Sequence, residues 1–186
     1  MSGELNGLLS PFLRRQRISA ALPFVRGRVL DWGCGSGALT PHCDPATYTG
    51  VDIERSVIET ARERHPAAHF HLLDAFDDAA HGPFDTIVAL AVIEHLPDPD
   101  AFISRMRGLL APGGHIVLTT PNPNLDWAHG VGGRLGIFSK ESHEEHQSLM
   151  DRTGIEAVAR RSGMTVAVYR RFLFGANQLA VLAHQG

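Results

Sequence analysis

Hydrophobic and polar residues alternate along this chain in two different patterns. Short runs rich in apolar and β-branched residues are separated by longer stretches in which apolar residues recur on one helical face. This alternation is typical of a parallel sheet whose strands are joined by crossover helices. The seven runs that we expect to be strands are residues 28–32, 47–52, 68–73, 84–91, 115–120, 165–172 and 178–183. The pattern therefore predicts a doubly wound α/β fold.

Three of these runs indicate how the sheet is built. Residues 84–91 are almost continuously apolar, as expected for a central strand that is buried on both faces. Residues 165–172 and 178–183 follow each other closely, so we expect them to form an antiparallel hairpin. The prediction is a seven-stranded, mostly parallel sheet with an antiparallel C-terminal hairpin strand.

Helices are expected between the strands. Pro99 opens a stretch in which Phe102, Ile103 and Met106 fall on one face, which is the pattern of a helix packed on a core. The other expected helices are residues 4–25, a short helix over 37–42, and residues 54–65 and 149–162. Prolines at 11 and 23 are expected to interrupt or end the first of them.

Length and composition indicate one globular domain. The chain has 186 residues, of which 44% are hydrophobic and 20% charged, so general disorder is not expected. We expect residues 1–186 to form a single domain, with an N-terminal helical segment over 1–25 and a long loop over 121–146.

Composition also excludes several classes of function. The net charge of -3 argues against a protein that grips a long nucleic acid. No run of about 18 apolar residues is present, so no membrane-spanning helix is expected. Cys34 and Cys43 cannot build a disulfide framework or a Cys-x-x-Cys zinc site and are expected to be small core residues. We therefore expect a cytoplasmic enzyme or binding domain, and leave its oligomeric state open.

A glycine-rich turn follows the first expected strand. It reads DWGCGSG from Asp31 to Gly37, with glycines at alternate positions. This spacing allows a sharp strand-to-helix turn and lets a ligand approach the bare backbone. A tight connection alone would explain such a turn, so its meaning depends on its neighbours.

Three acidic residues end three successive expected strands. Asp31, Asp52 and Asp74 each stand within one residue of the end of a strand. Open α/β sheets bind ligands at the carboxyl ends of their strands, where these side chains would meet. A carboxylate there can accept both hydroxyls of a ribose or the amino group of a purine. Together with the glycine-rich turn, the three acids indicate a nucleotide-like ligand.

These residues resemble the successive motifs of class I S-adenosylmethionine-dependent methyltransferases. The motifs are DWGCGSG, GVDI around Asp52, LLDA around Asp74, IEHLPDP after the fourth strand, and PGG followed by TPN. The resemblance is strong over residues 25–123 and greatest to the small single-domain branch that includes ubiquinone-biosynthesis O-methyltransferases. It implies a Rossmann-like fold, S-adenosylmethionine as cofactor, and methyl transfer to a small-molecule acceptor, with oxygen as the expected acceptor atom.

The same resemblance implies which residues bind the cofactor. They are Asp31, Gly33, Gly35 and Gly37 around the amino-acid moiety, Leu90 and Ala91 beneath the sulfonium, Asp52 at the ribose, Ile53 against the adenine, and Asp74 with Ala75 at the adenine edge. Trp32 departs from the family, which usually has an aliphatic residue at this position. We expect Trp32 to be a core residue.

Two alternatives to a methyltransferase remain open. A glycine-rich turn with an acid about twenty residues later also fits a NAD-linked oxidoreductase, although Asp31 and Asp74 favour the methyl donor. A non-catalytic S-adenosylmethionine-binding partner subunit of an active enzyme would carry the same motifs.

Methyl transfer from a sulfonium is an in-line displacement that depends on alignment and on exclusion of water. A base is needed when the acceptor must lose a proton, as a hydroxyl does. His95, just after the fourth strand, is the first candidate, and His143 and His146 are further catalytic candidates. A cap at the start of a helix would also explain the Glu94-His95 pair.

A divalent metal is a second possible role for these residues. Glu94 and His95, joined by His143 or His146, could hold a metal that positions the acceptor's oxygens. Metal-binding relatives show Glu-x-x-Glu-His after the fourth strand, whereas this chain has Ala91 in place of the first glutamate. A metal site is therefore doubtful.

The acceptor is expected to meet residues 121–146, because a polar, glycine-bearing loop of this length is usually functional. Trp127 and Phe138 could close over an acceptor or anchor the loop to the core. A basic cluster, Arg14, Arg15 and Arg17, could meet an anionic acceptor or form a solvated helix face.

Overall fold

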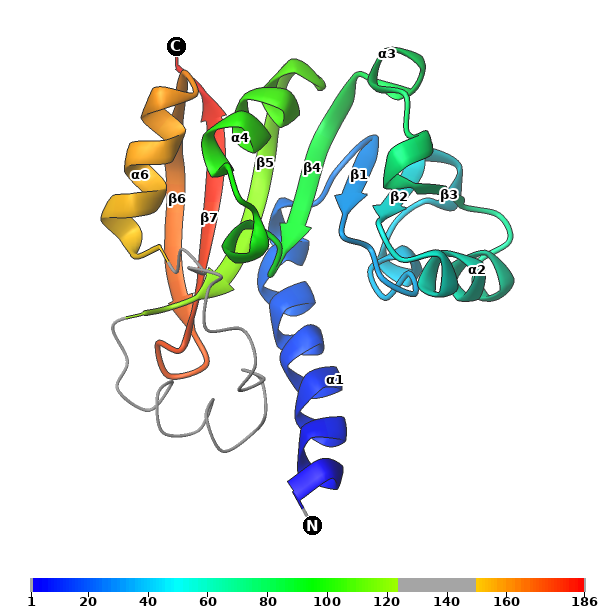
Figure 1. The fold of residues 1–186 in the computed structure, drawn as a ribbon. Coiled ribbons are helices and arrows are strands. Elements are labelled where there is room, and N and C mark those ends of the chain that lie inside the picture. Colours follow the sequence, from blue (N-terminus) through cyan, green and yellow to red (C-terminus); the bar gives the residue numbers. More distant parts are fainter. Residues whose placement is uncertain (1, 124–149, 186) are drawn as a thin grey trace.

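The computed structural model describes residues 2–123 and 150–185, and it contains one seven-stranded sheet with the order β3-β2-β1-β4-β5-β7-β6. Only β7 runs antiparallel to its neighbours, β5 and β6. The strands are β1 (Val29–Trp32), β2 (Tyr48–Asp52), β3 (His69–Leu72), β4 (Phe84–Leu90), β5 (Leu110–Pro121), β6 (Met164–Phe172) and β7 (Asn177–His184). The predicted seven-stranded, mostly parallel α/β fold with an antiparallel C-terminal strand is confirmed (Figure 1).

The helices of the described residues are α1 (Ser2–Ala21), α2 (Arg55–Arg64), α3 (Asp78–His81), α4 (Pro99–Gly108) and α6 (Arg152–Arg161). Short 3-10 turns cover Leu22–Phe24, Thr40–His42, Pro45–Thr47, Leu73–Ala75 and Ile93–His95. None of these helices is both long and apolar enough to cross a membrane.

Two of the predicted helices differ from the structure. The helix expected over residues 37–42 is wrong, because only the single 3-10 turn Thr40–His42 forms there. Gly37 has a left-handed φ of 78°, and Pro41 lacks the N–H that a longer helix would use. Conversely, Pro11 lies inside α1 without ending it.

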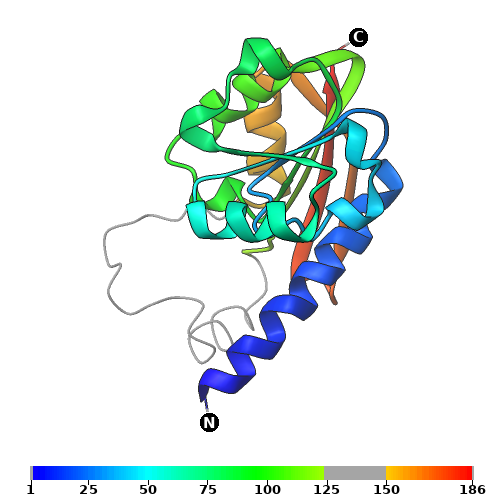
Figure 2. The same ribbon diagram turned by 90° about the vertical axis from the view of Figure 1, so that its right-hand side faces the viewer.

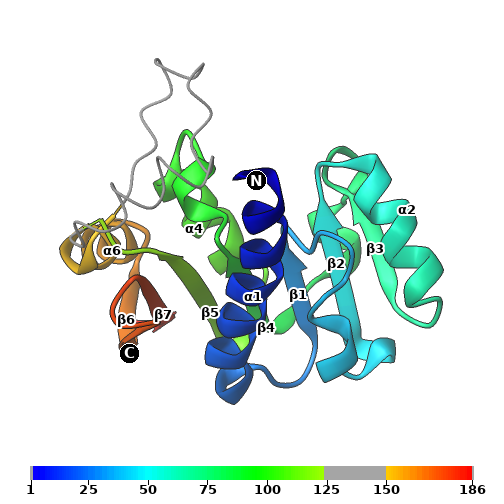
Figure 3. The same cartoon turned by 90° about the horizontal axis from the view of Figure 1, so that it is seen from below.

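Each face of the sheet carries its own apolar layer (Figure 3). On one face, α4 and α6 pack on the sheet through residues such as Ile103 and Ile155. On the other face, Ile18 of α1 and Ile58 of α2 belong to the second layer. Helices thus lie on both faces of the sheet, and ligands of this type of fold bind at the carboxyl ends of the strands.

Trp32 belongs to the first apolar layer, so the prediction that it is a core residue is confirmed. Its side chain is 5% exposed and its ring makes edge contacts with Phe76 and Phe102, at centroid distances of 6.0 and 5.8 Å. The guanidinium of Arg105 lies 4.6 Å from the ring centroid and also pairs with Asp78. Trp32 is therefore a structural residue that points away from the cleft described below.

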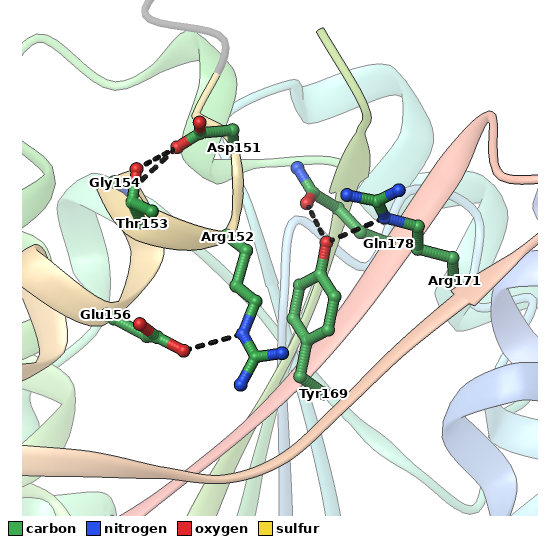
Figure 4. A network of polar contacts seen from close by, with 8 residues as sticks. All are labelled: Asp151, Arg152, Thr153, Gly154, Glu156, Tyr169, Arg171 and Gln178. Atoms are coloured by element: carbon green, nitrogen blue, oxygen red, sulfur yellow. Dashed lines mark hydrogen bonds and ion pairs between the residues drawn. The ribbon is translucent and has the colours of Figure 1, made fainter. Parts of the chain in front are cut away.

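A polar network fastens α6 to the last two strands (Figure 4). The Asp151 carboxylate caps α6 by accepting from the Gly154 N–H at 2.9 Å and from the Thr153 hydroxyl at 2.7 Å. The ring of Tyr169 lies 5.0 Å from the Arg152 guanidinium, and its hydroxyl donates to Gln178 at 2.8 Å. The contact of Arg152 with the Tyr169 ring and the hydrogen bond from Tyr169 to Gln178 thus link the start of α6 to β6 and β7.

Gln178 extends this network to the end of β5. Its side chain is fully buried and donates to the carbonyl oxygens of Pro121 and Met150. These two residues stand close to either end of the segment 124–149, which lies outside the described residues.

Helix α1 extends beyond the carboxyl ends of the parallel strands (Figures 1 and 2). Its C-terminal part packs on β4 and β5, with Ile18 and Ala21 buried. The predicted N-terminal helical segment is therefore a wall beside the edge of the sheet at which ligands of this fold bind.

Candidate functional site

The site begins at Asp31, near the carboxyl end of β1. Its side chain is 4% exposed, and one carboxylate oxygen accepts a hydrogen bond of 2.7 Å from the Tyr48 hydroxyl. Burial raises the pKa of Asp31 to about 7, and the negative charge of Asp52 adds to this, whereas the bond from Tyr48 lowers it. A carboxylate held this way favours a cationic ligand that would compensate its charge.

The glycines of the turn have different functions. A Cβ on Gly33 would lie 2.6 Å from Cγ2 of Val92, and its φ is 79°. A Cβ on Gly35 would meet no atom within 4 Å, so the backbone there faces open space. Gly37 packs instead against His65 and Phe70, at 2.8 and 3.2 Å from its Cβ position. Gly33 and Gly35 line a cleft, whereas Gly37 has a packing function away from it.

Asp52 ties the end of β2 to this turn. Its carboxylate accepts the Gly35 N–H at 2.8 Å and the Glu54 N–H at 3.0 Å. The next residue, Ile53, is 81% exposed, which is unusual for a large apolar side chain. Asp52 and Ile53 thus present a polar and an apolar group side by side at the edge of the sheet.

The third acid lies farther along the same edge. Asp74 and Ala75 are exposed within the 3-10 turn Leu73–Ala75 that directly follows β3. The strand ends are in register, because Asp52 pairs with Leu72. Asp31, Asp52 and Asp74 thus belong to the carboxyl ends of three neighbouring parallel strands.

The floor of the cleft comes from the end of β4. Leu90 is the last residue of β4, and Ala91 follows it with a left-handed φ of 57°. The Ala91 N–H donates to the Thr119 carbonyl at 2.8 Å, which fixes this unusual conformation. Left-handed backbone at a non-glycine residue costs energy and is frequent at functional sites.

These elements enclose a cleft of about 340 Å³. Its lining residues are Arg14, Arg17, Ile18, Asp31, Gly33, Cys34, Gly35, Ser36, Ala38, Leu39, Val57, Leu90 and Ala91. Five of them are cofactor residues predicted from the sequence: Asp31, Gly33, Gly35, Leu90 and Ala91.

The contribution of α1 to the cleft was not predicted as a cofactor contact. Arg14 and Arg17 stand one helical turn apart and both line the cleft, whereas Arg15 does not. The cleft therefore has a carboxylate, Asp31, on the sheet side and two guanidinium groups on the helix side. The signal in the sequence was the i, i+3 spacing of two arginines shortly before the first strand, but only the fold shows that they face this turn.

The residues named as metal ligands are only partly described. Glu94 is 4% exposed, whereas His95 beside it is exposed. Burial raises the pKa of Glu94, and the nearby charges of His95 and Arg17 lower it. His143 and His146 lie outside the described residues. Within residues 2–123 and 150–185, no three His, Cys, Asp or Glu side chains stand together as a metal site requires.

Comparisons with known proteins agree with this geometry. A family model described as "Methyltransferase domain" matches residues 5–167. The chain is 32% identical over 120 residues to a ubiquinone biosynthesis O-methyltransferase of Thiobacillus denitrificans, covering 60% of this chain and 52% of that protein. A protein of the same name from Hydrogenovibrio crunogenus is 28% identical over 177 residues, covering 88% of this chain and 73% of that protein. The chain thus spans about half the length of the first of these relatives.

Solved structures show the same fold. The magnesium protoporphyrin IX methyltransferase of Synechocystis PCC 6803, crystallised with bound SAH, superposes with a TM-score of 0.63 at 18% identity. The match covers 97% of this chain and 83% of that one. At this identity the likeness concerns the fold alone.

Proposed function

This chain belongs to the family of class I S-adenosylmethionine-dependent methyltransferases, and we propose that it transfers the cofactor's methyl group to an oxygen atom of a small-molecule acceptor. The oxygen assignment follows the relatives named as ubiquinone biosynthesis O-methyltransferases.

The observation that carries the proposal is the charge arrangement of the cleft. The amino-acid end of S-adenosylmethionine has an ammonium group and a carboxylate. Asp31 offers a buried negative charge on one side of the cleft, and Arg14 and Arg17 offer positive charge on the other. The open backbone at Gly35 leaves room for this end of the cofactor. The residues present therefore fit the cofactor.

The other cofactor contacts follow the edge of the sheet. We assign the ribose hydroxyls to Asp52, whose oxygens keep acceptor capacity beyond the two N–H groups that they bind. The exposed Ile53 would cover one face of the adenine, and Asp74 with Ala75 would meet its edge. Gly37 packs on His65 and Phe70 within the turn and is not among the residues that line the cleft.

The bound cofactor supplies a methyl group activated by a sulfonium. The chain's own part is to hold that group above Leu90 and Ala91 and to exclude water from it. We propose that exposed His95, in the turn after β4, accepts the proton of the acceptor hydroxyl. His143 and His146 remain candidates for the same role. A metal has no proposed step in this reaction.

Calorimetric titration with S-adenosylhomocysteine, S-adenosylmethionine and NAD⁺ tests the cofactor assignment. We expect binding of the first two ligands, and a loss of at least about tenfold in Asp52→Ala, because the hydrogen bonds from the ribose hydroxyls to a charged carboxylate are lost. Asp44→Ala is the matched control, since Asp44 caps the turn Pro45–Thr47 away from the cleft. Preferential binding of NAD⁺ would overturn the proposal and favour an oxidoreductase.

Catechol and aniline test the acceptor atom. Both are substituted benzene rings, but catechol presents hydroxyl oxygens and aniline presents an amino nitrogen. We expect methylated catechol by mass spectrometry and a drop in kcat of about 100-fold or more in His95→Ala, with unchanged S-adenosylhomocysteine affinity. Predominant N-methylation would refute the oxygen assignment. Cofactor binding without turnover of any phenol in a wider panel would favour the non-catalytic partner subunit.

A further inference from the structure

Arg17 is attached to a strand far away in the sequence. Its guanidinium is partly buried, and Nε donates to the side-chain oxygen of Asn177 at 3.0 Å. Arg17 has no other hydrogen-bond partner within the described part of the chain. Arg17 also lines the cleft, and a guanidinium carries further N–H donors besides Nε.

Asn177 is a rigid attachment point. It is 4% exposed and is the first residue of β7. Its backbone lies between Pro121 of β5 and Phe172 of β6, so strands on both sides hold it. An acceptor fixed in the sheet in this way restricts the rotamers of a long arginine side chain.

A buried acid, Glu94, lies near Arg17. Glu94 is 4% exposed, and its Oε2 has no hydrogen-bond partner among the described residues. The negative charge of Glu94 favours the charged form of Arg17, against the effect of burial on the arginine. The Arg17 guanidinium is thus held by Asn177 beside the cleft.

We propose that Asn177 is a positioning residue for the cofactor: by accepting from Arg17, it aims the guanidinium at the carboxylate of the cofactor's amino-acid end. This inference rests on the proposed function, because it needs S-adenosylmethionine or its product in the cleft. It makes the start of β7, about 140 residues after the glycine-rich turn, part of the cofactor site. No motif in the sequence marks this residue.

Two ligands separate positioning from general stabilisation. S-adenosylhomocysteine and 5′-methylthioadenosine share the adenine, ribose and sulfur, but only the first has the amino-acid end. Asn177→Thr removes the side-chain amide and introduces a residue that favours strands. We expect it to weaken the binding of S-adenosylhomocysteine about tenfold and to leave the binding of 5′-methylthioadenosine unchanged. Asn177→Asp, which keeps the acceptor oxygen, should restore most of the loss.

A double-mutant cycle tests whether Asn177 acts through Arg17. Arg17→Met should weaken S-adenosylhomocysteine at least as much as Asn177→Thr, and the double variant should lose no more than Arg17→Met alone. Arg15→Met is the matched control, because Arg15 is exposed on the same helix outside the cleft. This control should bind both ligands as the unmodified chain does.

The outcomes distinguish failure of this inference from failure of the proposed function. If neither ligand binds the unmodified chain, the cofactor assignment itself is wrong. If both bind and Asn177→Thr weakens them equally, or weakens neither, Asn177 does not position the cofactor. Additive losses in the cycle would also overturn the inference. If Asn177→Thr does not fold, the comparison of Asn177→Asp with Arg17→Met for the two ligands still decides.

Discussion

The turn after β1 and the turn after β6 lie at the same edge of the sheet, yet they use left-handed backbone differently. The first turn places glycines, Gly33 and Gly35, at its left-handed positions. The second places Leu173 and Phe174 there, with φ of 52° and 54°, before Gly175. Left-handed backbone costs a non-glycine residue about 1–2 kcal/mol, so only the second turn bears this strain.

What each turn presents to its surroundings explains the difference. At Gly33 a Cβ would collide with Val92, and at Gly35 it would fill the space left for the cofactor. The side chain of Phe174 is fully exposed, so nothing crowds it. Glycine is required where backbone must approach a neighbour or a ligand. Where a side chain projects into open space, the fold tolerates the strain because surrounding hydrogen bonds hold the turn.

The largest effect on stability or binding should come from adding a side chain to a glycine of the first turn. Gly33→Ala is expected to cost about 2–4 kcal/mol of unfolding free energy, because backbone strain adds to the clash with Val92. Gly35→Ala should cost only about 1–2 kcal/mol, since it meets no protein atom, but it should abolish S-adenosylhomocysteine binding. Urea unfolding and calorimetry measure the two effects. Equal stability losses in the two variants would show that the clash with Val92 is unimportant.

The stability of the second turn should depend on the side chain of Asn122, which is hydrogen-bonded to it. Asn122 is 1% exposed, and its amide donates to the Gly175 carbonyl at 2.8 Å. Asn122→Ala should lower the unfolding free energy by about 1–3 kcal/mol, because that carbonyl loses its partner. Arg160→Ala, an exposed change on α6, should cost less than about 0.5 kcal/mol. Similar melting temperatures for both variants would show that the Asn122 hydrogen bond does not stabilise the second turn.

A change of pH should affect the first turn through Asp31. Its pKa in the folded protein is about 7, raised from 3.8, so the ligand-free folded state holds this proton more tightly than the unfolded chain. The contribution of Asp31 to stability is therefore greatest below about pH 4 and is lost as the pH rises to 7. The ammonium of the cofactor should lower this pKa, so binding near pH 6 should release a proton.

The measurement is calorimetry with S-adenosylhomocysteine in buffers of different ionisation enthalpy. Affinity should be about tenfold weaker at pH 6 than at pH 8, because Asp31 must first lose its proton. Asp31→Asn should bind weakly, without this pH dependence. Tyr48→Phe removes a hydrogen bond that lowers the pKa of Asp31, so the dependence should move to higher pH. If the affinity of the unmodified chain does not change with pH, Asp31 does not face the ammonium.

The smallest effect should be a gain in stability at the second turn. Phe174→Asn is expected to raise the unfolding free energy by about 0.5–1 kcal/mol, because asparagine tolerates left-handed backbone and no burial is lost. Phe174→Ala keeps the unfavourable backbone preference and should show no such gain. A rise in melting temperature for both variants would mean that the exposed ring, and not the backbone, is the unfavourable element.

How well the site could be predicted depends on how far apart in the sequence its contacting residues lie. Asp31, Gly33 and Gly35 belong to one turn, and Asp52 and Asp74 follow strands that parallel crossovers bring beside it, so local pattern and fold class together predicted them. The helix expected over residues 37–42 was wrong, because propensity did not reveal the left-handed Gly37. Gly37 itself was expected to contact the cofactor, but it packs on His65 and Phe70.

The amino-acid sequence by itself determined the seven strands, their mostly parallel order and the acids at their ends, because periodicity and turn residues act over a few neighbours. Only the tertiary structure decided that α1 forms the second wall of the cleft, and that Asn177 holds Arg17 from a strand 160 positions away. It also decided that Glu94 is buried while His95 is exposed, although the two are adjacent. Such contacts depend on how distant elements pack together, and no local pattern of residues encodes that packing.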